Sequence, residues 1–132
     1  MNIPPWIQAC VADFGKQLGL DPWELSSAGT AGFLFEDGTE IQLEVTSERL
    51  YFLLLRAYDG SLQTLQQLLQ SAHLARQHKV AVRAAVLPRR NMAMWVSSCA
   101  LQEVTLPQLE ALFQAVWEAS EVTLKGAADD LA

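Results

Sequence analysis

The sequence predicts a single α+β domain in which helices cover one face of an antiparallel sheet. Two features lead to this class. Apolar residues recur at helical spacing in separate segments, and short β-type segments bounded by turn residues lie between them. The predicted order is α-β-β-β-α-β-β-α. The length of 132 residues, with 51% hydrophobic and 18% charged residues, fits one domain over residues 1–124, followed by a frayed tail over residues 125–132.

The first predicted helix follows Pro4 and Pro5. Proline is tolerated in the first turn of a helix, because the backbone N–H that it lacks would have no partner there. Gly19 is a natural stop for this helix. Between these limits, apolar side chains recur at helical spacing at Ile7, Cys10, Val11, Phe14 and Leu18.

Three strands are predicted next. Residues 30–35 form a short, partly aromatic strand, and the pair Asp37-Gly38 supplies the positive φ values of a tight hairpin turn. Beyond that turn, apolar and polar residues alternate over residues 41–45, so one face of this strand is apolar. Residues 49–57 are apolar on both faces, and this strand therefore needs cover on both sides.

A second helix is predicted from Ser61, which can cap its start, to about Lys79. No Asp, Glu, Lys or Arg occurs from Gly60 through Ala75. Such a helix has either a merely polar outer face or a face that can be buried against another protein, because amide groups pair without the cost of burying ions. The face opposite its leucine stripe carries Gln63, Gln67, Gln70 and Leu74.

Two strands and a last helix complete the predicted order. Residues 80–87 and 92–99 form a hairpin around residues 88–91, whose composition is that of a turn. Thr105 and Gln108 have the spacing of a capping box, which predicts that the last helix starts there.

Charge and cysteine usage limit the possible environment and partners. A net charge of -6 disfavours a phosphate-binding surface, so we expect no nucleic acid partner. The start of the chain lacks the features of a signal peptide, and the longest apolar run, residues 50–55, is far too short to cross a membrane. Cys10 and Cys99 lack metal-ligand spacing and suit a reducing compartment. We expect a soluble cytoplasmic protein without membrane insertion.

The sequence contains no clear catalytic pattern. His73 and His78 would lie about 140° apart around a helix, so they cannot hold one metal ion together. Cys99 and the serines before it are not preceded by a nucleophile elbow. We therefore expect a protein that is not an enzyme and that needs no cofactor or metal.

The first half of the chain is rich in large apolar residues. Some of them form the core, and an excess over that core would line a groove that accepts apolar side chains of a partner. These residues are Trp6, Trp23, Phe33, Phe35, Ile41, Leu43 and Val45.

Several local patterns, taken in order, resemble the class I chaperones of bacterial type III secretion systems. The patterns are FGKQLGL at residues 14–20, FLFEDG at 33–38, IQLEV at 41–45, LQQLL at 65–69 and LPQLEAL at 106–112. The resemblance covers about residues 6–120 and rests on the joint order of these patterns rather than on any one of them.

The resemblance implies a type III secretion chaperone-like, dimeric fold, built as a homodimer or as a heterodimer with a related chain. Carried over by position, it implies that the client-binding groove is lined by Trp6, Trp23, Phe33, Phe35, Ile41 and Leu43. It implies that the dimer interface contains Leu65, Gln67, Gln70, Leu74 and Val82.

The function implied by the resemblance is a type III secretion chaperone. Such a protein binds the N-terminal segment of a secreted effector or regulator in extended, non-globular form and keeps it export-competent without ATP. Strand pairing and side-chain pockets make this mode physically reasonable. The alternative is a non-catalytic α+β adaptor or scaffold that binds a folded protein partner. The two differ in whether the bound segment is extended or globular.

Overall fold

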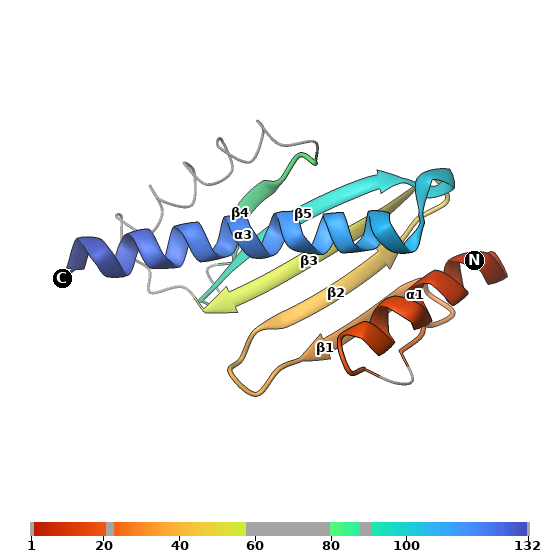
Figure 1. Cartoon of the computed structure of the whole chain (residues 1–132), viewed down its shortest axis with the longest axis horizontal. Helices are drawn as coiled ribbons and strands as arrows, with labels where there is room; N and C mark the ends of the chain where they lie inside the picture. Colours follow the sequence, from red (N-terminus) through yellow and green to blue (C-terminus); the bar gives the residue numbers. More distant parts are fainter. Residues whose placement is uncertain (1, 21–22, 58–79, 88–90, 132) are drawn as a thin grey trace.

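The order of helices and strands agrees with the α+β class. The computed structural model describes residues 2–20, 23–57, 80–87 and 91–131 (Figure 1). Its elements are α1 (Pro5–Gln17), β1 (Thr30–Leu34), β2 (Glu40–Val45), β3 (Arg49–Ala57), β4 (Arg83–Leu87), β5 (Met92–Ala100), the 3-10 turn η1 (Leu101–Glu103) and α3 (Leu106–Leu131). The helix predicted from Ser61 to Lys79 lies outside the described residues.

The strands form one antiparallel five-stranded sheet in the order β1-β2-β3-β5-β4. A hairpin turn joins β1 and β2 at the predicted place, but Gly38 alone of the predicted pair has a positive φ, and Asp37 does not. Gly38 has a φ of 90° in that turn, and the backbone N–H of Thr39 donates to Oδ1 of Asp37 at 2.8 Å. β5 lies between β3 and β4, so β1 and β4 are the edge strands of the described sheet.

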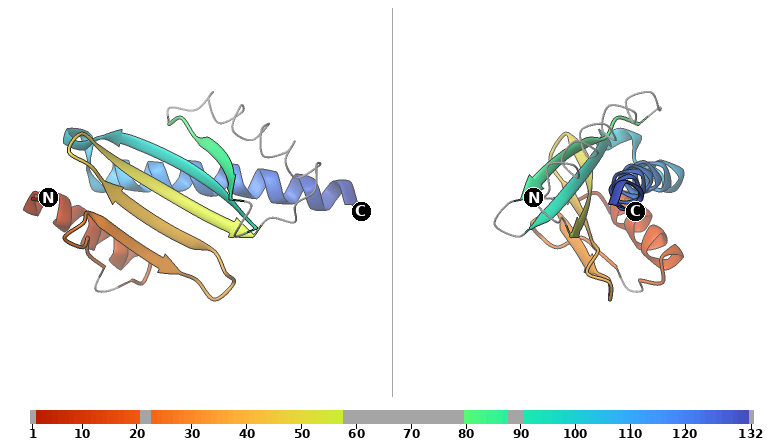
Figure 2. Two further views of the ribbon diagram at one scale, coloured as in Figure 1. Left: turned by 180° about the vertical axis from the view of Figure 1, so that it is seen from behind. Right: turned by 90° about the vertical axis from the view of Figure 1, so that its left-hand side faces the viewer.

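The helices α1 and α3 cover one face of the sheet. Figure 2 shows both on the same side, and no helix of the described residues covers the opposite face. The core lies between the two layers. Its largest fully buried side chains include Trp95 from β5, Phe52 and Leu54 from β3, and Leu109 and Leu112 from α3, each 0% exposed. Burying each such side chain stabilises the fold by about 1.5–3 kcal/mol before entropy is counted.

The loop after α1 is bound to both layers. Trp23 is 7% exposed, packs against Gly15 and donates a hydrogen bond from Nε1 to the carbonyl oxygen of Gly32 at 3.3 Å. The side chain of Gln8 accepts a hydrogen bond from the backbone N–H of Leu25 and donates one to its carbonyl oxygen. These contacts fix the path of the chain between α1 and β1.

Gly15 is the point at which this loop crosses the helix. A Cβ atom at residue 15 would lie 2.6 Å from Cβ of Trp23 and 2.8 Å from the carbonyl oxygen of Leu20. Overpacking of this kind costs about 1–3 kcal/mol, which exceeds the roughly 0.5–1 kcal/mol that alanine contributes to a helix. We expect Gly15→Ala to lower the free energy of unfolding in urea. Gly32→Ala is the control, since its Cβ would meet nothing nearer than 3.6 Å, and an equal loss in both variants would contradict this packing.

The last helix starts as predicted and extends to Leu131. The backbone N–H of Gln108 donates to Oγ1 of Thr105 at 3.1 Å, which caps α3. The helix continues to Leu131, so most of the tail predicted over residues 125–132 is helical; its fraying stays a prediction. Ala127 and Ala128, residues with the highest helix propensity, favour this continuation. Among the described residues, neither α3 nor α1 combines the length and the apolar character that crossing a membrane requires.

Candidate functional site

An apolar groove lies on the helix-covered side of the molecule, between the end of α1, the middle of α3 and the β1–β2 turn. It consists of two adjoining hollows of about 470 and 340 Å³, which share the side chains of Leu18, Phe113 and Trp117. Phe35 and Thr39 line the larger hollow from the turn. We call this feature the helix-face groove.

The floor of the helix-face groove is continuous with the core. The rings of Phe113 and Trp117 are stacked, with centroids 6.0 Å apart and an interplanar angle of 24°. Phe113 in turn packs edge-on against Phe14 and Phe52, at centroid distances of 5.8 and 5.6 Å. Because Phe14 and Phe52 are buried, these rings hold the shape of the groove before any partner binds.

Arg56 holds Trp117 from the side of the sheet. Its guanidinium carbon lies 5.1 Å from the centroid of the Trp117 ring, and its Nη1 donates to Ser120 and to Glu121, with which it forms an ion pair. A cation–π contact at an exposed site contributes about 0.5–1 kcal/mol. A tryptophan that is already oriented loses less conformational freedom when a partner covers it.

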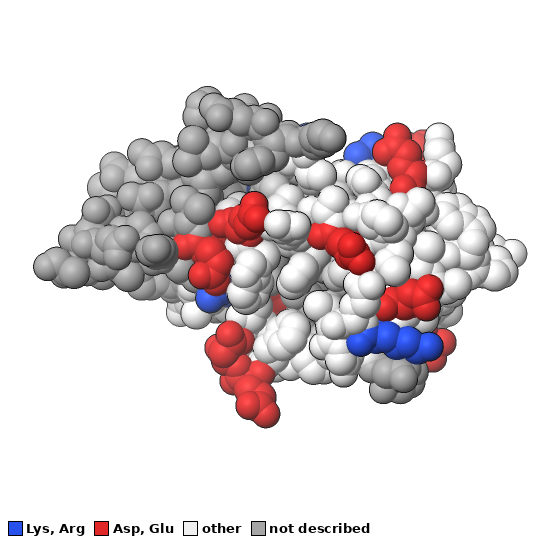
Figure 3. Space-filling view, viewed as in Figure 1, with Lys and Arg blue, Asp and Glu red and all other residues white. Residues whose placement is uncertain are grey.

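Acidic side chains surround the helix-face groove. Glu36 and Asp37 line it from the β1–β2 turn and Glu110 lines it from α3. The hydrogen bond from the backbone N–H of Thr39 holds the pKa of Asp37 below its usual range, so this carboxyl remains charged. Figure 3 shows red acidic patches around an uncharged centre on this face. The groove therefore suits a segment with apolar side chains and basic neighbours.

Three of the predicted groove residues lie at the surface. Phe35 lines the helix-face groove, and Phe33, which is 38% exposed, packs edge-on against it with ring centroids 4.9 Å apart. Trp6 is 46% exposed in the first turn of α1 and lines neither hollow. These three side chains remain candidates for contact with a partner.

Other predicted site residues are buried within the chain. Ile41 and Leu43 are 0% exposed, and Trp23 is 7% exposed. The prediction that these three line a surface groove is wrong: Ile41 and Leu43 lie on the face of β2 that the helices cover, and Trp23 packs against Gly15 of α1. Val82, predicted at the dimer interface, is 2% exposed and packs in the same core, so its side chain is not on the surface.

The side chains that α1 and α3 contribute to the helix-face groove are not among the predicted groove residues. Leu18 is predicted only as the end of the apolar stripe of the first helix, and Trp117 belongs to no predicted site. A usable signal was present, since Phe113 and Trp117 are four residues apart on α3 and lie off the buried stripe of Leu112 and Val116. Large apolar residues beside a helix's buried stripe indicate a second contact surface.

Ser97 and Cys99 of β5 are buried. The hydroxyl of Ser97 is buried and donates to the carbonyl oxygen of Leu112 at 3.0 Å. Cys99 is 3% exposed, and burial raises the pKa of its thiol above the usual value. A raised pKa disfavours the thiolate, which is the nucleophilic form.

We expect the two thiols to differ in reactivity. Cys10 is partly exposed and Cys99 is buried, so a thiol reagent such as DTNB should modify Cys10 quickly in the native protein and Cys99 only after denaturation. Because folding raises the pKa of Cys99, the folded state should lose stability as the pH rises through the range in which the unfolded thiol ionises, about 8.5. Cys99→Ala should remove this loss in urea denaturation at pH 8 to 10. Rapid modification of Cys99 in the native protein would contradict this assignment.

β1 offers part of a free sheet edge. In the pairing with β2, alternate residues of β1, namely Thr30, Gly32 and Leu34, direct their backbone groups outward. Ser26 bonds both backbone groups of Thr30, and Trp23 bonds the carbonyl oxygen of Gly32. No hydrogen bond within the described part of the chain reaches the N–H of Gly32 or the backbone groups of Leu34. These groups can pair with an added strand.

Comparison with protein families decides the class of the protein. Residues 6–123 match the family described as Type III secretory system chaperone SycN. The chain belongs to this family. The match includes all the helices and strands of the described fold except the last turns of α3. The description of the family is that of a chaperone, which suggests a non-enzymatic protein. A search of curated proteins found no match.

Solved structures with the same fold are remote in sequence from this SycN-family chaperone. A chain in the crystal structure of the ExsC-ExsE complex has a TM-score of 0.72 and 17% identity, with 92% of each chain covered. A chain of the HopA1-SchA chaperone-effector complex has a TM-score of 0.65 and 15% identity, covering 89% of this chain and 94% of that one. A chain of the complex between the Yersinia pestis type III secretion chaperone SycH and a fragment of YscM2 has a TM-score of 0.61 and 16% identity, covering 88% of this chain and 98% of that one. At such identities the similarity shows the fold alone.

The predicted dimer interface of the chaperone lies largely outside the described residues. This applies to Leu65, Gln67, Gln70 and Leu74, all within residues 58–79. Their role in a dimer stays a prediction.

Proposed function

We propose that this SycN-family chaperone binds the N-terminal segment of a secreted effector or regulator in extended form and keeps it export-competent in the cytoplasm without ATP. The observation that carries this proposal is the helix-face groove, whose apolar floor is partly exposed although the described residues already form a buried core beside it. Membership of a chaperone family supports it. Of the similar structures described above, HopA1-SchA is a chaperone-effector complex, and the secretion chaperone SycH is in complex with a fragment of YscM2.

The helix-face groove supports binding of side chains rather than of a folded surface. Its hollows of about 470 and 340 Å³ are large enough for individual apolar side chains. Trp117 and Phe113 provide stacked aromatic surface, which is a common anchor in protein recognition. The neighbouring Glu36, Asp37 and Glu110 favour basic residues beside those anchors.

The outward backbone of β1 supports an extended partner. A strand added beside β1 would pair with the N–H of Gly32 and with both backbone groups of Leu34, and would place alternate side chains toward the helix-covered face. Phe33, near the end of β1, and Phe35, just after it, lie beside these backbone groups. A segment ordered only on binding gives up part of its contact energy as lost entropy, so it can be released without an energy source.

We also propose that the chaperone acts as a dimer, as a homodimer or as a heterodimer with a related chain. The uncharged segment from Gly60 through Ala75 supports this part of the proposal, because it can be buried without burying ions. Leu65, Gln67, Gln70 and Leu74 are the proposed contact residues. Light scattering of the purified chain, alone and with its related chain, tests it.

The extended binding mode is tested by hydrogen exchange. The full chain is purified with the N-terminal segment of a secreted protein encoded next to it, and amide exchange is compared with and without the segment. We expect slower exchange at Gly32 and Leu34 and an extended conformation of the bound segment. Protection confined to a globular partner surface, with no change along β1, would favour the adaptor alternative instead.

A pair of variants separates backbone pairing from side-chain contact. Leu34→Pro removes an outward N–H at an edge strand, where proline is tolerated, and should weaken segment binding about fivefold through the lost hydrogen bond. Leu34→Ala keeps that N–H and removes an exposed side chain. Equal binding by the two variants would show that β1 does not pair with the segment.

A further inference from the structure

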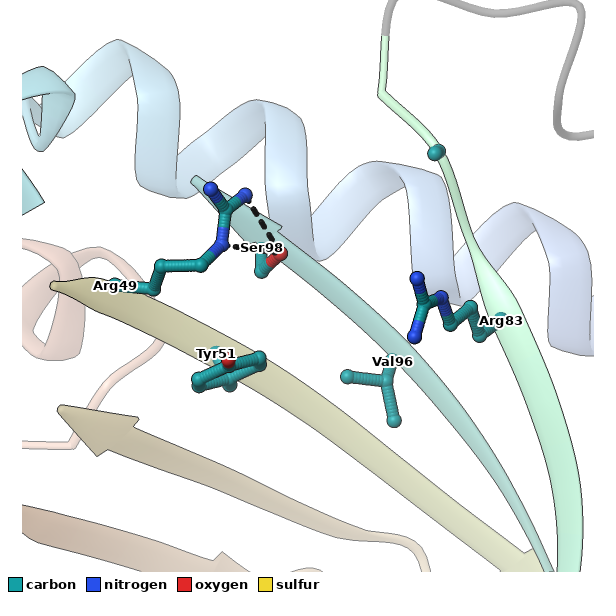
Figure 4. Close-up of a pocket in the computed structure, with 6 residues that line it drawn as sticks. Arg49, Tyr51, Arg83, Val96 and Ser98 are labelled. Atoms are coloured by element: carbon teal, nitrogen blue, oxygen red, sulfur yellow. Dashed lines mark hydrogen bonds between the residues drawn. The ribbon is translucent and has the colours of Figure 1, made fainter. Parts of the chain in front are cut away.

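A second pocket lies on the face of the sheet opposite the helices. It has a volume of about 340 Å³ and is lined by Arg49 and Tyr51 of β3, Val96 and Ser98 of β5, Arg83 of β4, and Ala81. Figure 4 shows the side chains of Tyr51 and Val96 between those of the two arginines. The pocket shares no lining residue with the helix-face groove and is independent of the function proposed for that groove.

Positive charge is concentrated in this pocket. The structure describes the side chains of four basic residues, and two of them, Arg49 and Arg83, line it. Of the others, Arg56 is paired with Glu121, and Lys16 lies on α1. The lining contains no carboxylate. On a chain of net charge -6, a pocket that holds two arginines and no acidic residue is suited to a negatively charged ligand.

The hydrogen bonds of Arg49 leave donors available. Its Nε and Nη2 donate to Oγ of Ser98 at 3.3 and 3.0 Å, which holds the guanidinium over the sheet (Figure 4). A guanidinium has five N–H donors, so the remaining ones can reach a carboxylate. Arg83 is exposed and is in no ion pair within the described part of the chain.

The sheet register sets the spacing between the two charges. Arg49 is opposite Ala100 of β5 and Arg83 is opposite Val96, so their backbone positions are four residues apart along that strand. Four residues of extended chain span about 13 Å, and β3 and β4 flank β5 on opposite sides, which adds a sideways offset of about 10 Å and gives a backbone separation of about 16 Å. The long arginine side chains can close the difference of about 3 Å from the span of four residues. In an extended polypeptide, residues i, i+2 and i+4 point to the same side. Acidic side chains at i and i+4 can therefore face the two arginines, while residue i+2 faces Tyr51 and Val96.

We propose that this pocket binds an extended acidic segment of a protein partner. Carboxylates at positions i and i+4 of the segment bind Arg49 and Arg83, and an apolar side chain at i+2 packs on Tyr51 and Val96. A single small anion can engage one guanidinium but not the apolar floor between them. A nucleic acid would be repelled by the rest of this acidic chain.

The test measures binding of a labelled peptide with the pattern Glu-Thr-Leu-Thr-Glu to the full-length protein by fluorescence anisotropy, with the contact site mapped by NMR. We expect Arg49→Gln and Arg83→Gln each to weaken binding about fivefold, since charge-assisted hydrogen bonds are lost from a partly exposed site. Lys16→Gln is the matched control, because it removes the same charge outside the pocket. Trp117→Ala, in the helix-face groove, should leave this binding unchanged.

Four results would overturn the proposal. The first is equal binding of the neutral peptide Gln-Thr-Leu-Thr-Gln, and the second is a loss of peptide affinity in Lys16→Gln equal to that in the arginine variants. The third is full displacement of the peptide by inorganic phosphate at the same concentration. The fourth is a change of molar mass in solution in the arginine variants. The third would indicate a general anion site, and the fourth an interface between copies of this chain. Circular dichroism of each variant verifies that the fold is retained.

Discussion

Replacing Trp117 by alanine is expected to weaken binding of the secreted segment about 30-fold, which corresponds to the loss of one aromatic anchor of about 2 kcal/mol. Trp117 is 36% exposed, lines both hollows of the helix-face groove and stacks on Phe113. The variant removes the largest side chain that a bound segment can cover there. Isothermal titration of the purified chaperone with the segment measures the effect.

The matched control for this prediction is Trp6→Ala. Trp6 is 46% exposed, so a similar aromatic surface is lost, but it lines neither hollow. We expect binding by this variant to change less than about threefold, as for residues away from a binding hot spot. If Trp6→Ala weakened binding as much as Trp117→Ala, the segment would extend along α1 to its first turn. If Trp117→Ala bound normally, the helix-face groove would not be the binding site.

Replacing Phe52 by alanine is expected to lower the free energy of unfolding by about 3–5 kcal/mol. The side chain is 0% exposed, and its ring packs edge-on against Phe14 and Phe113, each with a centroid distance of 5.6 Å. Its loss leaves a cavity beneath the groove that the surrounding rings cannot fill. Domains of this size have a free energy of unfolding of about 5–15 kcal/mol, so this substitution would remove a large part of it. Urea denaturation followed by tryptophan fluorescence measures it.

Phe33→Ala is the control for the stability of the core. Phe33 is 38% exposed and packs mainly on Phe35, so its removal should cost less than about 1 kcal/mol. Similar losses in Phe33→Ala and Phe52→Ala would mean that the aromatic cluster is not the centre of the core. A small loss in Phe52→Ala would mean that Phe14 and Phe113 close the cavity by moving.

Local sequence signals predicted most of the described fold. The Asp37-Gly38 turn and the cap at Thr105 were both found where their chemistry indicated. These signals work because they depend on a few neighbouring residues, such as a positive φ or a side chain that reaches a nearby N–H. The place of β5 between β3 and β4 has no such local signal, since it depends on a connection across the sheet.

The sequence by itself determined the α+β class, most strand positions and the resemblance to type III secretion chaperones that the family match confirms. Only the tertiary structure decided which apolar residues are available to a partner. Alternation along β2 shows that Ile41 and Leu43 share a face, but not that α1 and α3 cover it. A groove exists only where separate elements meet, and Leu18, Phe35 and Trp117 come together through packing rather than through any spacing along the chain.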